Sequence, residues 1–175
     1  MSRIISGRYG GLYIANPKHS IRPTTSKVKE YIFNVLQNLE GRRVIDLFCG
    51  TGALGIEALS HNAEHVTFVD NNSHSIQLSR INLESIKAPE DTWKCIKNNA
   101  IRFFKRNKNT YDIILADPPY DLVLDKEFFN DCREHLTDKG LVILEYSSRG
   151  IVESGEWKPS KIKKMGDTNI YFFQK

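Results

Sequence analysis

The sequence predicts an α/β protein built on a mostly parallel, doubly wound sheet. The chain has 175 residues, of which 40% are hydrophobic and 26% are charged, a composition typical of one globular domain. From residue 43 onwards, short apolar runs alternate with segments of helical periodicity. No repeat or long linker interrupts them. Such alternation is typical of βαβ units, in which helices cover both faces of a parallel sheet.

Five apolar runs are predicted to form the strands of this sheet, at residues 43–48, 65–70, 92–97, 111–117 and 140–147. Helical segments follow the first four strands, at residues 53–60, 73–87, 100–108 and 125–135. The chain closes with residues 158–175, in which two short runs flank Gly166-Asp167. This arrangement predicts a C-terminal antiparallel hairpin.

The start of the chain differs from the rest. Residues 3–14 are rich in glycine and mildly alternating, which predicts a short β-hairpin. A helix is expected after residues 23–25, Pro-Thr-Thr, because threonine is a good N-cap. One face of that helix is predicted to be apolar, through Val28, Ile32, Val35, Leu36 and Leu39. We therefore expect a basic N-terminal extension at residues 1–25, packed through this helix on a main domain at residues 26–175.

Positive charge is concentrated in two segments. The formal net charge is +4, yet residues 1–29 hold no acid and six basic side chains: Arg3, Arg8, Lys18, Arg22, Lys27 and Lys29. Residues 91–108 hold one acid, Asp91, and six more basic side chains: Lys94, Lys97, Arg102, Lys105, Arg106 and Lys108. Segregated positive charge suits a polyanionic partner. For the second segment read alone, a solvated helix face is the more common reason for such a pattern.

Several classes of protein are excluded by composition. No run approaches the ~18 apolar residues of a membrane span, and the first residues lack the apolar core of a secretory signal. Cys49, Cys95 and Cys132 are odd in number and widely spaced, so neither a disulfide framework nor a zinc site is expected. The five histidines show no metal-ligand or triad spacing. We expect a cytoplasmic protein with free thiols and no bound metal.

A glycine-rich turn lies between the first strand and the first helix. Gly50, Gly52 and Gly55 form the pattern GxGxxG, which lets backbone approach a ligand at a helix N-terminus. Asp70, at the end of the second strand, is placed to bind ribose hydroxyls. NAD, S-adenosylmethionine and a purely structural turn all fit this pattern. Asp46 favours the sulfonium cofactor, because its carboxylate suits an ammonium but would lie unfavourably close to a pyrophosphate.

The tetrapeptide Asp117-Pro118-Pro119-Tyr120 follows the fourth strand directly. Ligands of open α/β sheets bind beyond the carboxyl ends of the strands, so this motif and the glycine turn should face one crevice. The residue types suit methylation of an exocyclic base amine. Asp117 and the Pro118 carbonyl would accept the amine hydrogens, the prolines would hold both rigidly, and Tyr120 would stack on the base. The alternative is a Pro-Pro turn with Tyr120 in the core.

These motifs together resemble a family of bacterial methyltransferases that modify the exocyclic N2 of one guanine in small-subunit (16S) ribosomal RNA. The matching segments are RIISGRYGG at the start, RPTTSKVKEYIFNVL at 22–36, DLFCGTGALGIEALS at 46–60, NNA at 98–100, DPPY at 117–120 and GDTNIYFF near the end. The resemblance therefore covers nearly the whole chain. It implies a Rossmann-like class I methyltransferase fold that uses S-adenosyl-L-methionine.

The resemblance also implies roles for single residues. The cofactor-binding residues that it implies are Asp46, Phe48, Gly50, Gly52, Asp70, Asn71, Asn99 and Ala100. Asn99 stands at an adenine-contacting position where many relatives carry Asp. The implied catalytic residues are Asp117, Pro118, Pro119 and Tyr120, with Tyr where many members have Phe. The implied substrate-binding residues are Arg3, Arg8, Arg22, Thr24 and Thr25.

We therefore predict an S-adenosylmethionine-dependent rRNA (guanine-N2-)-methyltransferase. Its expected partner is 16S rRNA in an assembling or assembled small ribosomal subunit, with no membrane and no obligate protein partner. A DNA adenine-N6 methyltransferase is the nearest alternative, because the tetrapeptide suits that amine too. A non-catalytic RNA-binding or ribosome-assembly factor on the same fold is an alternative of another class, and a nicotinamide-dependent oxidoreductase is the most distant. The residues alone do not distinguish guanine from adenine.

Overall fold

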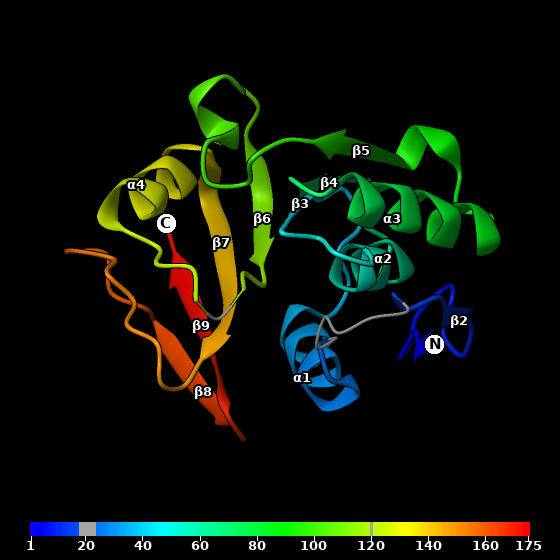
Figure 1. Cartoon of the computed structure of the whole chain (residues 1–175), viewed down its shortest axis with the longest axis horizontal. Helices are drawn as coiled ribbons and strands as arrows, with labels where there is room; N and C mark the ends of the chain where they lie inside the picture. The colour runs from blue at the N-terminus through cyan, green and yellow to red at the C-terminus, as the bar shows by residue number, and fades with distance from the viewer. Residues whose placement is uncertain (18–23, 120) are drawn as a thin grey trace.

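Figure 1 shows a computed structural model of the chain, in which residues 1–17, 24–119 and 121–175 are described. Its centre is a seven-stranded sheet of order β5-β4-β3-β6-β7-β9-β8. The strands are β3 (Arg43–Leu47), β4 (His65–Asp70), β5 (Trp93–Lys97), β6 (Tyr111–Ala116), β7 (Leu136–Ser147), β8 (Lys161–Met165) and β9 (Thr168–Gln174). Strands β3 to β7 pair in parallel, whereas β9 and β8 are antiparallel. The predicted parallel sheet and C-terminal hairpin are confirmed.

The centre of the sheet contains a topological switch point. β3 pairs with β4 on one side and with β6 on the other, although β6 lies far along the chain. The register places Asp46 opposite Leu115 and Leu47 opposite Ala116. The chain therefore leaves β3 and β6 at the same edge, where ligands of open α/β sheets bind.

Helices cover both faces of the sheet, as predicted (Figure 1). On one face lie α1 (Ser26–Leu36), α2 (Ala53–Ser60) and α3 (Ser73–Ser85), and the buried residues there form one core cluster. On the other face, α4 (Lys126–Glu134) forms a second core with β6, β7 and β9. A 3₁₀ turn, η1 (Glu90–Thr92), leads into β5. Among the described residues, no helix has the length and apolar character needed to cross a membrane.

The helix predicted at residues 100–108 is wrong. The structure has only one 3₁₀ turn there, η2 (Phe103–Lys105). Phe103 and Phe104 are buried in the second core, and Asn99 accepts a hydrogen bond from the Arg102 N–H at 3.1 Å. Two aromatic anchors in a short segment favour a single turn over a continued helix. As a result, α4 and η2 leave the β4 and β5 side of this face open.

The N-terminal extension begins with the predicted hairpin, β1 (Ser2–Arg3) and β2 (Tyr13–Ile14). It docks on a buried ion pair between α1 and α2: Lys29 Nζ lies 2.9 Å from Glu57 Oε1, and both side chains are 0% exposed. Lys29 also donates to the Arg3 carbonyl at 2.6 Å, and the Ile5 N–H donates to Glu57 at 2.8 Å. The hairpin therefore packs on α2 through polar contacts as well as apolar ones.

The predicted apolar face of α1 is partly wrong. Val28 and Ile32 are buried, but Val35 is 40% exposed. Lys29 and Phe33 are buried instead. The buried face of the helix therefore includes Lys29, whose ammonium reaches Glu57 inside the protein.

Candidate active site

Three residues of the turn after β3 have a left-handed backbone conformation. The φ angles are 61° at Phe48, 54° at Gly50 and 79° at Gly52. Glycine adopts this conformation freely, whereas it is costly for Phe48, and such strain is characteristic of functional sites. Gly55 has another purpose, because an added Cβ there would collide with the ring of Phe68 on β4. The first two glycines of the motif shape the turn, and the third lets α2 pack closely on β4.

Asp46 lies near the end of β3 and is 1% exposed. Its Oδ2 accepts a hydrogen bond from the Gly55 N–H at 2.8 Å. Burial raises its pKa to about 8, assisted by the negative charges of Asp117 and Asp70 and opposed by the Gly55 hydrogen bond. The carboxylates of these three aspartates are thus close enough to interact. The ends of β3, β4 and β6 thus bring all three to one edge of the sheet.

Asp70 ends β4 and connects two turns of this edge. Its Oδ2 accepts a hydrogen bond from the Gly50 N–H at 3.0 Å, and its Oδ1 accepts one from the Asn72 N–H at 2.8 Å. Asn71, which lies between Asp70 and Asn72 in the sequence, is exposed. The Asn72 side chain then caps α3 by accepting from the His74 N–H at 2.8 Å. The carboxylate is thereby fixed beside the glycine turn, and Asp70 is half-buried.

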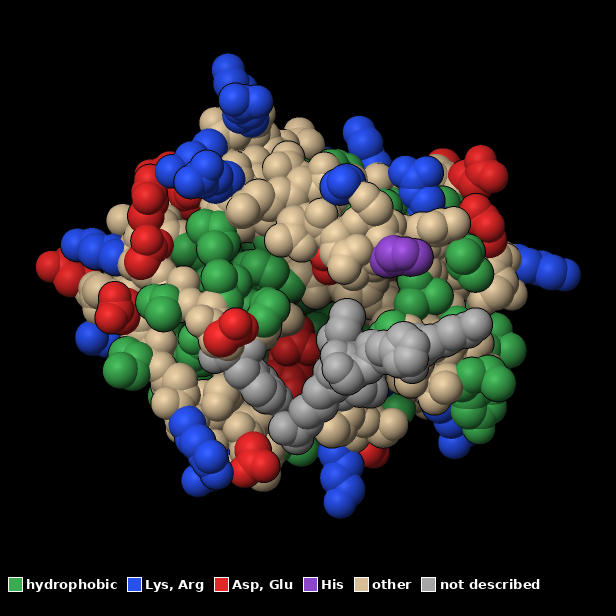
Figure 2. All heavy atoms as spheres, in the orientation of Figure 1, with side chains coloured by type: hydrophobic (Ala, Val, Ile, Leu, Met, Phe, Trp, Pro, Cys, Tyr) green, Lys and Arg blue, Asp and Glu red, His purple; other side chains and the backbone are tan. Residues whose placement is uncertain are grey.

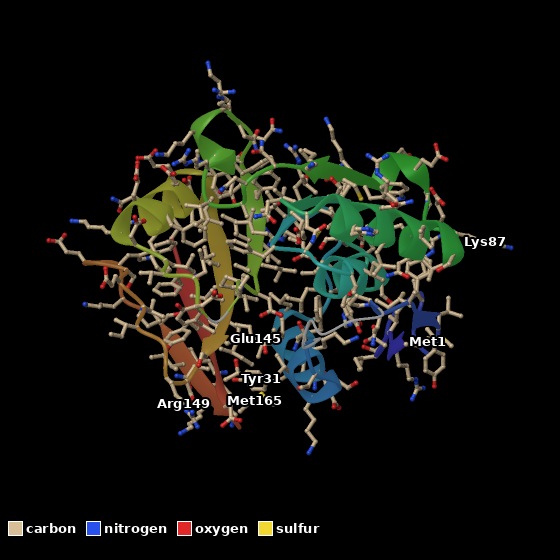
Figure 3. All side chains as sticks on the ribbon, in the orientation of Figure 1. Met1, Tyr31, Lys87, Glu145, Arg149 and Met165 are labelled. Carbon is tan, nitrogen blue, oxygen red and sulfur yellow. The ribbon has the colours of Figure 1, made fainter. Side chains whose placement is uncertain are left out.

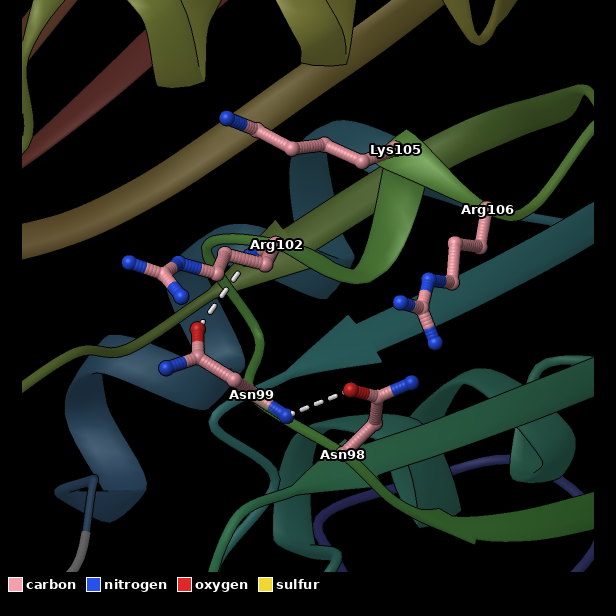
Figure 4. A pocket seen from close by; sticks show the side chains of 5 residues that line it. All are labelled: Asn98, Asn99, Arg102, Lys105 and Arg106. Carbon is pink, nitrogen blue, oxygen red and sulfur yellow. Dashed lines mark hydrogen bonds between the residues drawn. The ribbon is translucent and has the colours of Figure 1, made fainter.

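The segment after β5 lies beside Asp70, because the Asn98 N–H donates to the Asp70 carbonyl at 2.9 Å. Asn99 is exposed, and its side-chain oxygen caps the following turn at the Arg102 N–H (Figure 4). Figure 4 shows its amide nitrogen directed away from that turn. Ala100, the next residue, is buried.

The tetrapeptide follows β6 at the same edge. Asp117 is half-buried, and the Thr24 hydroxyl donates to its Oδ2 at 2.6 Å. Pro118 is buried and Pro119 is exposed. Tyr120 lies outside the described residues. The contact between Thr24 and Asp117 brings this threonine of the RPTT segment to the tetrapeptide, although 93 residues separate the two in the sequence.

The residues implied to bind substrate lie in different surroundings. Thr25 is the N-cap of α1, and its Oγ1 accepts from the Val28 N–H at 3.3 Å. Arg3 and Arg8 are exposed on the N-terminal hairpin. Arg22 lies outside the described residues. The structure therefore brings Thr24 to the predicted catalytic motif, while Thr25 has a helix-capping contact.

Two buried polar residues of α3 support the site and were missed by sequence reasoning. The Ser79 hydroxyl donates to the Gly50 carbonyl at 3.0 Å. The Asn82 amide donates to the Thr51 carbonyl at 2.9 Å and pairs with both backbone groups of Ala15. They hold the glycine turn and the N-terminal extension to α3. The available signal was two polar residues spaced three apart on the inward face of a predicted helix.

Figure 2 shows a hollow in the middle of one face of the molecule, with acidic side chains at its floor. Figure 3 places Glu145 at the centre of the same view, between β7 and α1. Glu145 is 5% exposed, and sequence reasoning gave it no role. An acidic hollow suits a cationic ligand. Within the described ranges, no group of three or more His, Cys, Asp and Glu side chains could hold a metal ion.

Comparison with known proteins identifies relatives of this chain. The family described as Conserved hypothetical protein 95 matches residues 2–174. The Ribosomal RNA small subunit methyltransferase D of Escherichia coli K12 is 30% identical over 183 residues, 99% of this chain and 89% of that protein. A solved Escherichia coli structure, yhhF, provisionally described as a methyltransferase, has a TM-score of 0.86 and 29% identity, covering 99% of this chain and 97% of that chain.

A more distant structure carries the same fold. The SAM-dependent methyltransferase from Agrobacterium tumefaciens is 27% identical with a TM-score of 0.60, and the match covers 70% of this chain and 44% of that chain. The resemblance seen in the motifs and the match of residues 2–174 agree with the sheet order and the crevice. The chain therefore belongs to the Conserved hypothetical protein 95 family, that of the bacterial small-subunit rRNA methyltransferases, within the class I S-adenosylmethionine-dependent methyltransferases.

Proposed function

We propose that the protein transfers a methyl group from S-adenosyl-L-methionine to the exocyclic N2 amine of a guanine in 16S rRNA. The observation that carries the proposal is the meeting of two motifs at one sheet edge. The glycine turn follows β3 and the tetrapeptide follows β6, and Asp117 is close enough to raise the pKa of Asp46. Membership of the rRNA methyltransferase family supports RNA as the substrate.

The residues of the glycine turn fit a cationic nucleoside cofactor. Gly50 and Gly52 leave backbone without side chains at the turn, and Asp46 and Asp70 add carboxylates beside it. When bound, the cofactor supplies an electrophilic methyl group on sulfur. Asp70 would accept ribose hydroxyls, Asp46 would attract the ammonium of the methionine part, and Asn99 would contact the adenine. Phe48, Asn71 and Ala100 would contribute the backbone around this pocket.

Asp117 is the proposed acceptor for the amine of the target base. An exocyclic amine is a weak nucleophile because its lone pair is delocalised into the ring. A fixed carboxylate and the Pro118 carbonyl would hold the amine hydrogens so that the nitrogen lone pair faces the methyl group. The Thr24 hydroxyl orients the Asp117 carboxylate, which makes Thr24 a positioning residue. Alignment and fixed electrostatics would supply most of the rate, and Tyr120 would stack on the base.

The N-terminal extension, residues 1–25, is proposed to contact the RNA. Arg3 and Arg8 are exposed there, and Arg22 belongs to the same basic segment. Arginine binds phosphate through two parallel hydrogen bonds, so these residues would position the RNA without reading its bases. Residues 26–175 would then form the catalytic domain. An enzyme with this substrate works where ribosomal subunits assemble, in the cytoplasm, and needs no obligate protein partner of its own.

The test is transfer of labelled methyl from S-adenosylmethionine to small ribosomal subunits that lack the modification, followed by nucleoside analysis. We expect label in N2-methylguanosine. Label in N6-methyladenosine would leave the methyl-transfer reaction as proposed and make adenine, not guanine, the target base. Absence of both label and cofactor binding, measured by calorimetry on the same sample, would contradict the proposal and favour a non-catalytic RNA-binding factor.

A further inference from the structure

The open part of the sheet contains two adjoining hollows. One has a volume of about 400 Å³ and the other of about 360 Å³. Asn98 and Arg106 line both of them, so the two form one continuous groove, here called the open-sheet groove. It lies where the predicted helix at 100–108 is replaced by the short turn η2. Its basic side chains are Arg43, His65, Lys94, Arg102, Lys105 and Arg106.

The groove is positively charged. Among the described residues that line it, none is Asp or Glu. Lys105 is less available to a ligand than the other basic residues, because its ammonium forms an ion pair with Glu127 of α4 at 2.8 Å. Figure 4 shows Arg102 and Arg106 extending on either side of the Asn98–Asn99 segment, while Lys105 points away. At least two guanidinium groups therefore face the hollow without that ion pair.

Nearby acids do not neutralise the groove. Asp112 pairs with Arg42 at 3.3 Å and accepts the Arg43 N–H at 2.9 Å, so its charge is engaged outside the lining. Glu64 is exposed next to His65 and lies outside the lining as well. On α4, Glu127 and Asp131 act on Lys105, so the positive charge of the groove rests on its remaining cations, Arg43, Lys94, Arg102 and Arg106.

The sheet spaces these cations regularly. Arg43 on β3 is the register partner of His65 on β4. Thr67, two residues further along β4, is the partner of Lys94 on β5. Neighbouring strands lie about 4.8 Å apart, so the three side chains cross three strands on one face. A rigid sheet thus presents the cations of Arg43 and Lys94 on either side of His65.

The chemistry of His65 reports the same positive field. Its pKa is lowered by partial burial and then by the charges of Arg43 and Lys94, with a smaller opposing effect of Glu64. A histidine in this position is discouraged from taking a proton. A bound anion would reverse that effect and raise the pKa.

The groove begins at the proposed active site, because Asn99, the proposed adenine contact, lines the first hollow. Asn98 follows β5 and donates to the Asp70 carbonyl at 2.9 Å, at the carboxyl edge of the sheet. Arg43 and His65 start their strands, at the opposite edge. The groove therefore runs from the cofactor side of the molecule across the sheet and away from it.

We propose that the open-sheet groove binds the sugar–phosphate backbone of the rRNA next to the target nucleotide. The inference rests on the proposed function, since it assigns a second contact surface to the same substrate. Charge complementarity selects the occupant: cations together with amide donors from Asn98, Asn107 and Asn109 match a chain of phosphates and riboses. The N-terminal extension and the groove would hold RNA from two separate parts of the molecule.

The experiment compares two double variants that each remove two positive charges. Arg43→Gln/Lys94→Gln removes charge from the groove. Lys87→Gln/Lys164→Gln removes it from the turn that follows α3 and from β8, outside the lining. Binding to a protein-free 16S rRNA transcript is measured over a range of salt concentrations. We expect about tenfold weaker binding for the groove variant, and a salt slope smaller by about 0.7 to 0.9 per lost contact.

Further measurements separate the possible results. Lys94→Gln/Arg106→Gln repeats the test with another pair, and thermal unfolding identifies any variant that is misfolded. NMR titration of His65, assigned with His65→Asn, should show a higher pKa when the transcript is bound. Unchanged cofactor affinity is expected by calorimetry, and a loss of it would assign the groove to the cofactor and overturn the inference.

The inference and the proposed function fail in different ways. Equal transcript binding by the groove and control variants, with wild-type methylation intact, would overturn the inference alone. Weaker binding to ribosomal subunits but normal binding to free rRNA would assign the groove to an acidic ribosomal protein, which also overturns it. A wild-type protein that neither binds nor methylates rRNA would overturn both.

Discussion

The two halves of the crevice are held in different ways. At the ends of β3 and β4, contacts within the sheet and its adjoining helices fix the glycine turn: Asp46 to Gly55, and Asp70 to Gly50. At the end of β6, Asp117 is oriented by Thr24, which precedes α1. The cofactor half is thus built by the sheet and its helices. The target half depends on the docked N-terminal extension, so the two halves should respond differently to substitution.

Asp117→Ala should have the largest effect and should break only the target half. We expect about a 10²–10³-fold loss of turnover, the cost of removing one aligned electrostatic group from a reaction centre. Cofactor affinity should change little, because Asp117 follows β6 and does not belong to the glycine turn. Single-turnover methyl transfer and calorimetry measure the two effects separately. Full turnover in the folded variant would remove Asp117 from the mechanism.

Asp70→Ala should break the cofactor half instead. The variant loses the acceptor for the Gly50 and Asn72 N–H groups as well as the proposed ribose contact. We expect cofactor binding to weaken about 10- to 100-fold, since hydrogen bonds to charged groups contribute about 1.5–3 kcal/mol each. Asp70→Asn keeps one side-chain acceptor, so its cofactor affinity should lie between that of Asp70→Ala and that of the wild type. Calorimetry with S-adenosylhomocysteine measures all three.

Asp46 should make the cofactor half sensitive to pH. Its pKa is about 8 in the folded protein against 3.8 ordinarily, so the folded state holds a proton that the unfolded state releases. Its contribution to stability is therefore complete below about pH 4 and is lost as the pH rises to about 8, by at most about 1.4 kcal/mol per unit. Urea unfolding at pH 5, 7 and 9 should show a shallower decline for Asp46→Asn. An identical pH profile in the two proteins would contradict this assignment.

A cationic cofactor should couple to the same proton. It favours the ionised carboxylate of Asp46, so cofactor affinity should rise with pH up to about 8. Calorimetry in buffers of different ionisation enthalpy would detect the proton released on binding. Asp46→Asn has no such proton and serves as the control.

Thr24→Val tests the contact between the halves. The substitution keeps the shape of the side chain and removes the hydroxyl that donates to Asp117. We expect about a tenfold loss of kcat, the lower end for a hydrogen bond to a charged group, with little change in KM. Thr24→Ser restores the hydroxyl and should recover most of the activity. A loss confined to KM would make Thr24 an RNA contact instead.

Thr25→Ala should have the smallest effect and a different kind of effect. Thr25 caps α1, and loss of an N-cap costs about 1 kcal/mol of stability. Urea unfolding should detect the change. Turnover per folded molecule decides between two roles: if it falls, Thr25 contacts the RNA as the family resemblance implies, and if it holds, capping is its whole contribution.

The sequence predicts the cofactor half better than the target half for a physical reason. Asp46, Asp70 and the glycines lie at strand ends or turns, where local pattern determines position. The bond between Thr24 and Asp117 joins distant segments, so no local pattern indicates it. The same limit hid Ser79, whose partner Gly50 lies 29 residues away.

The predicted helix at 100–108 failed for the opposite reason. Its local pattern of basic residues around Phe103-Phe104 is typical of an amphipathic helix. A single 3₁₀ turn is enough to bury both phenylalanine rings, so tertiary packing overrides the local preference for a helix. Because the short turn leaves that part of the sheet uncovered, the basic residues line a groove instead of a helix surface.

The buried pair of Lys29 and Glu57 constrains the order in which this chain can fold. Residues of the N-terminal extension have partners far along the chain: Ile5 bonds to Glu57 52 residues on, and Thr24 bonds to Asp117 93 residues on. Contacts so distant in sequence form slowly, because a long loop must close first. During synthesis at the ribosome, we expect the nascent N-terminus to stay undocked until α2 has emerged. Orientation of Asp117 would then be among the last steps of maturation, so a partly made enzyme could not methylate RNA prematurely.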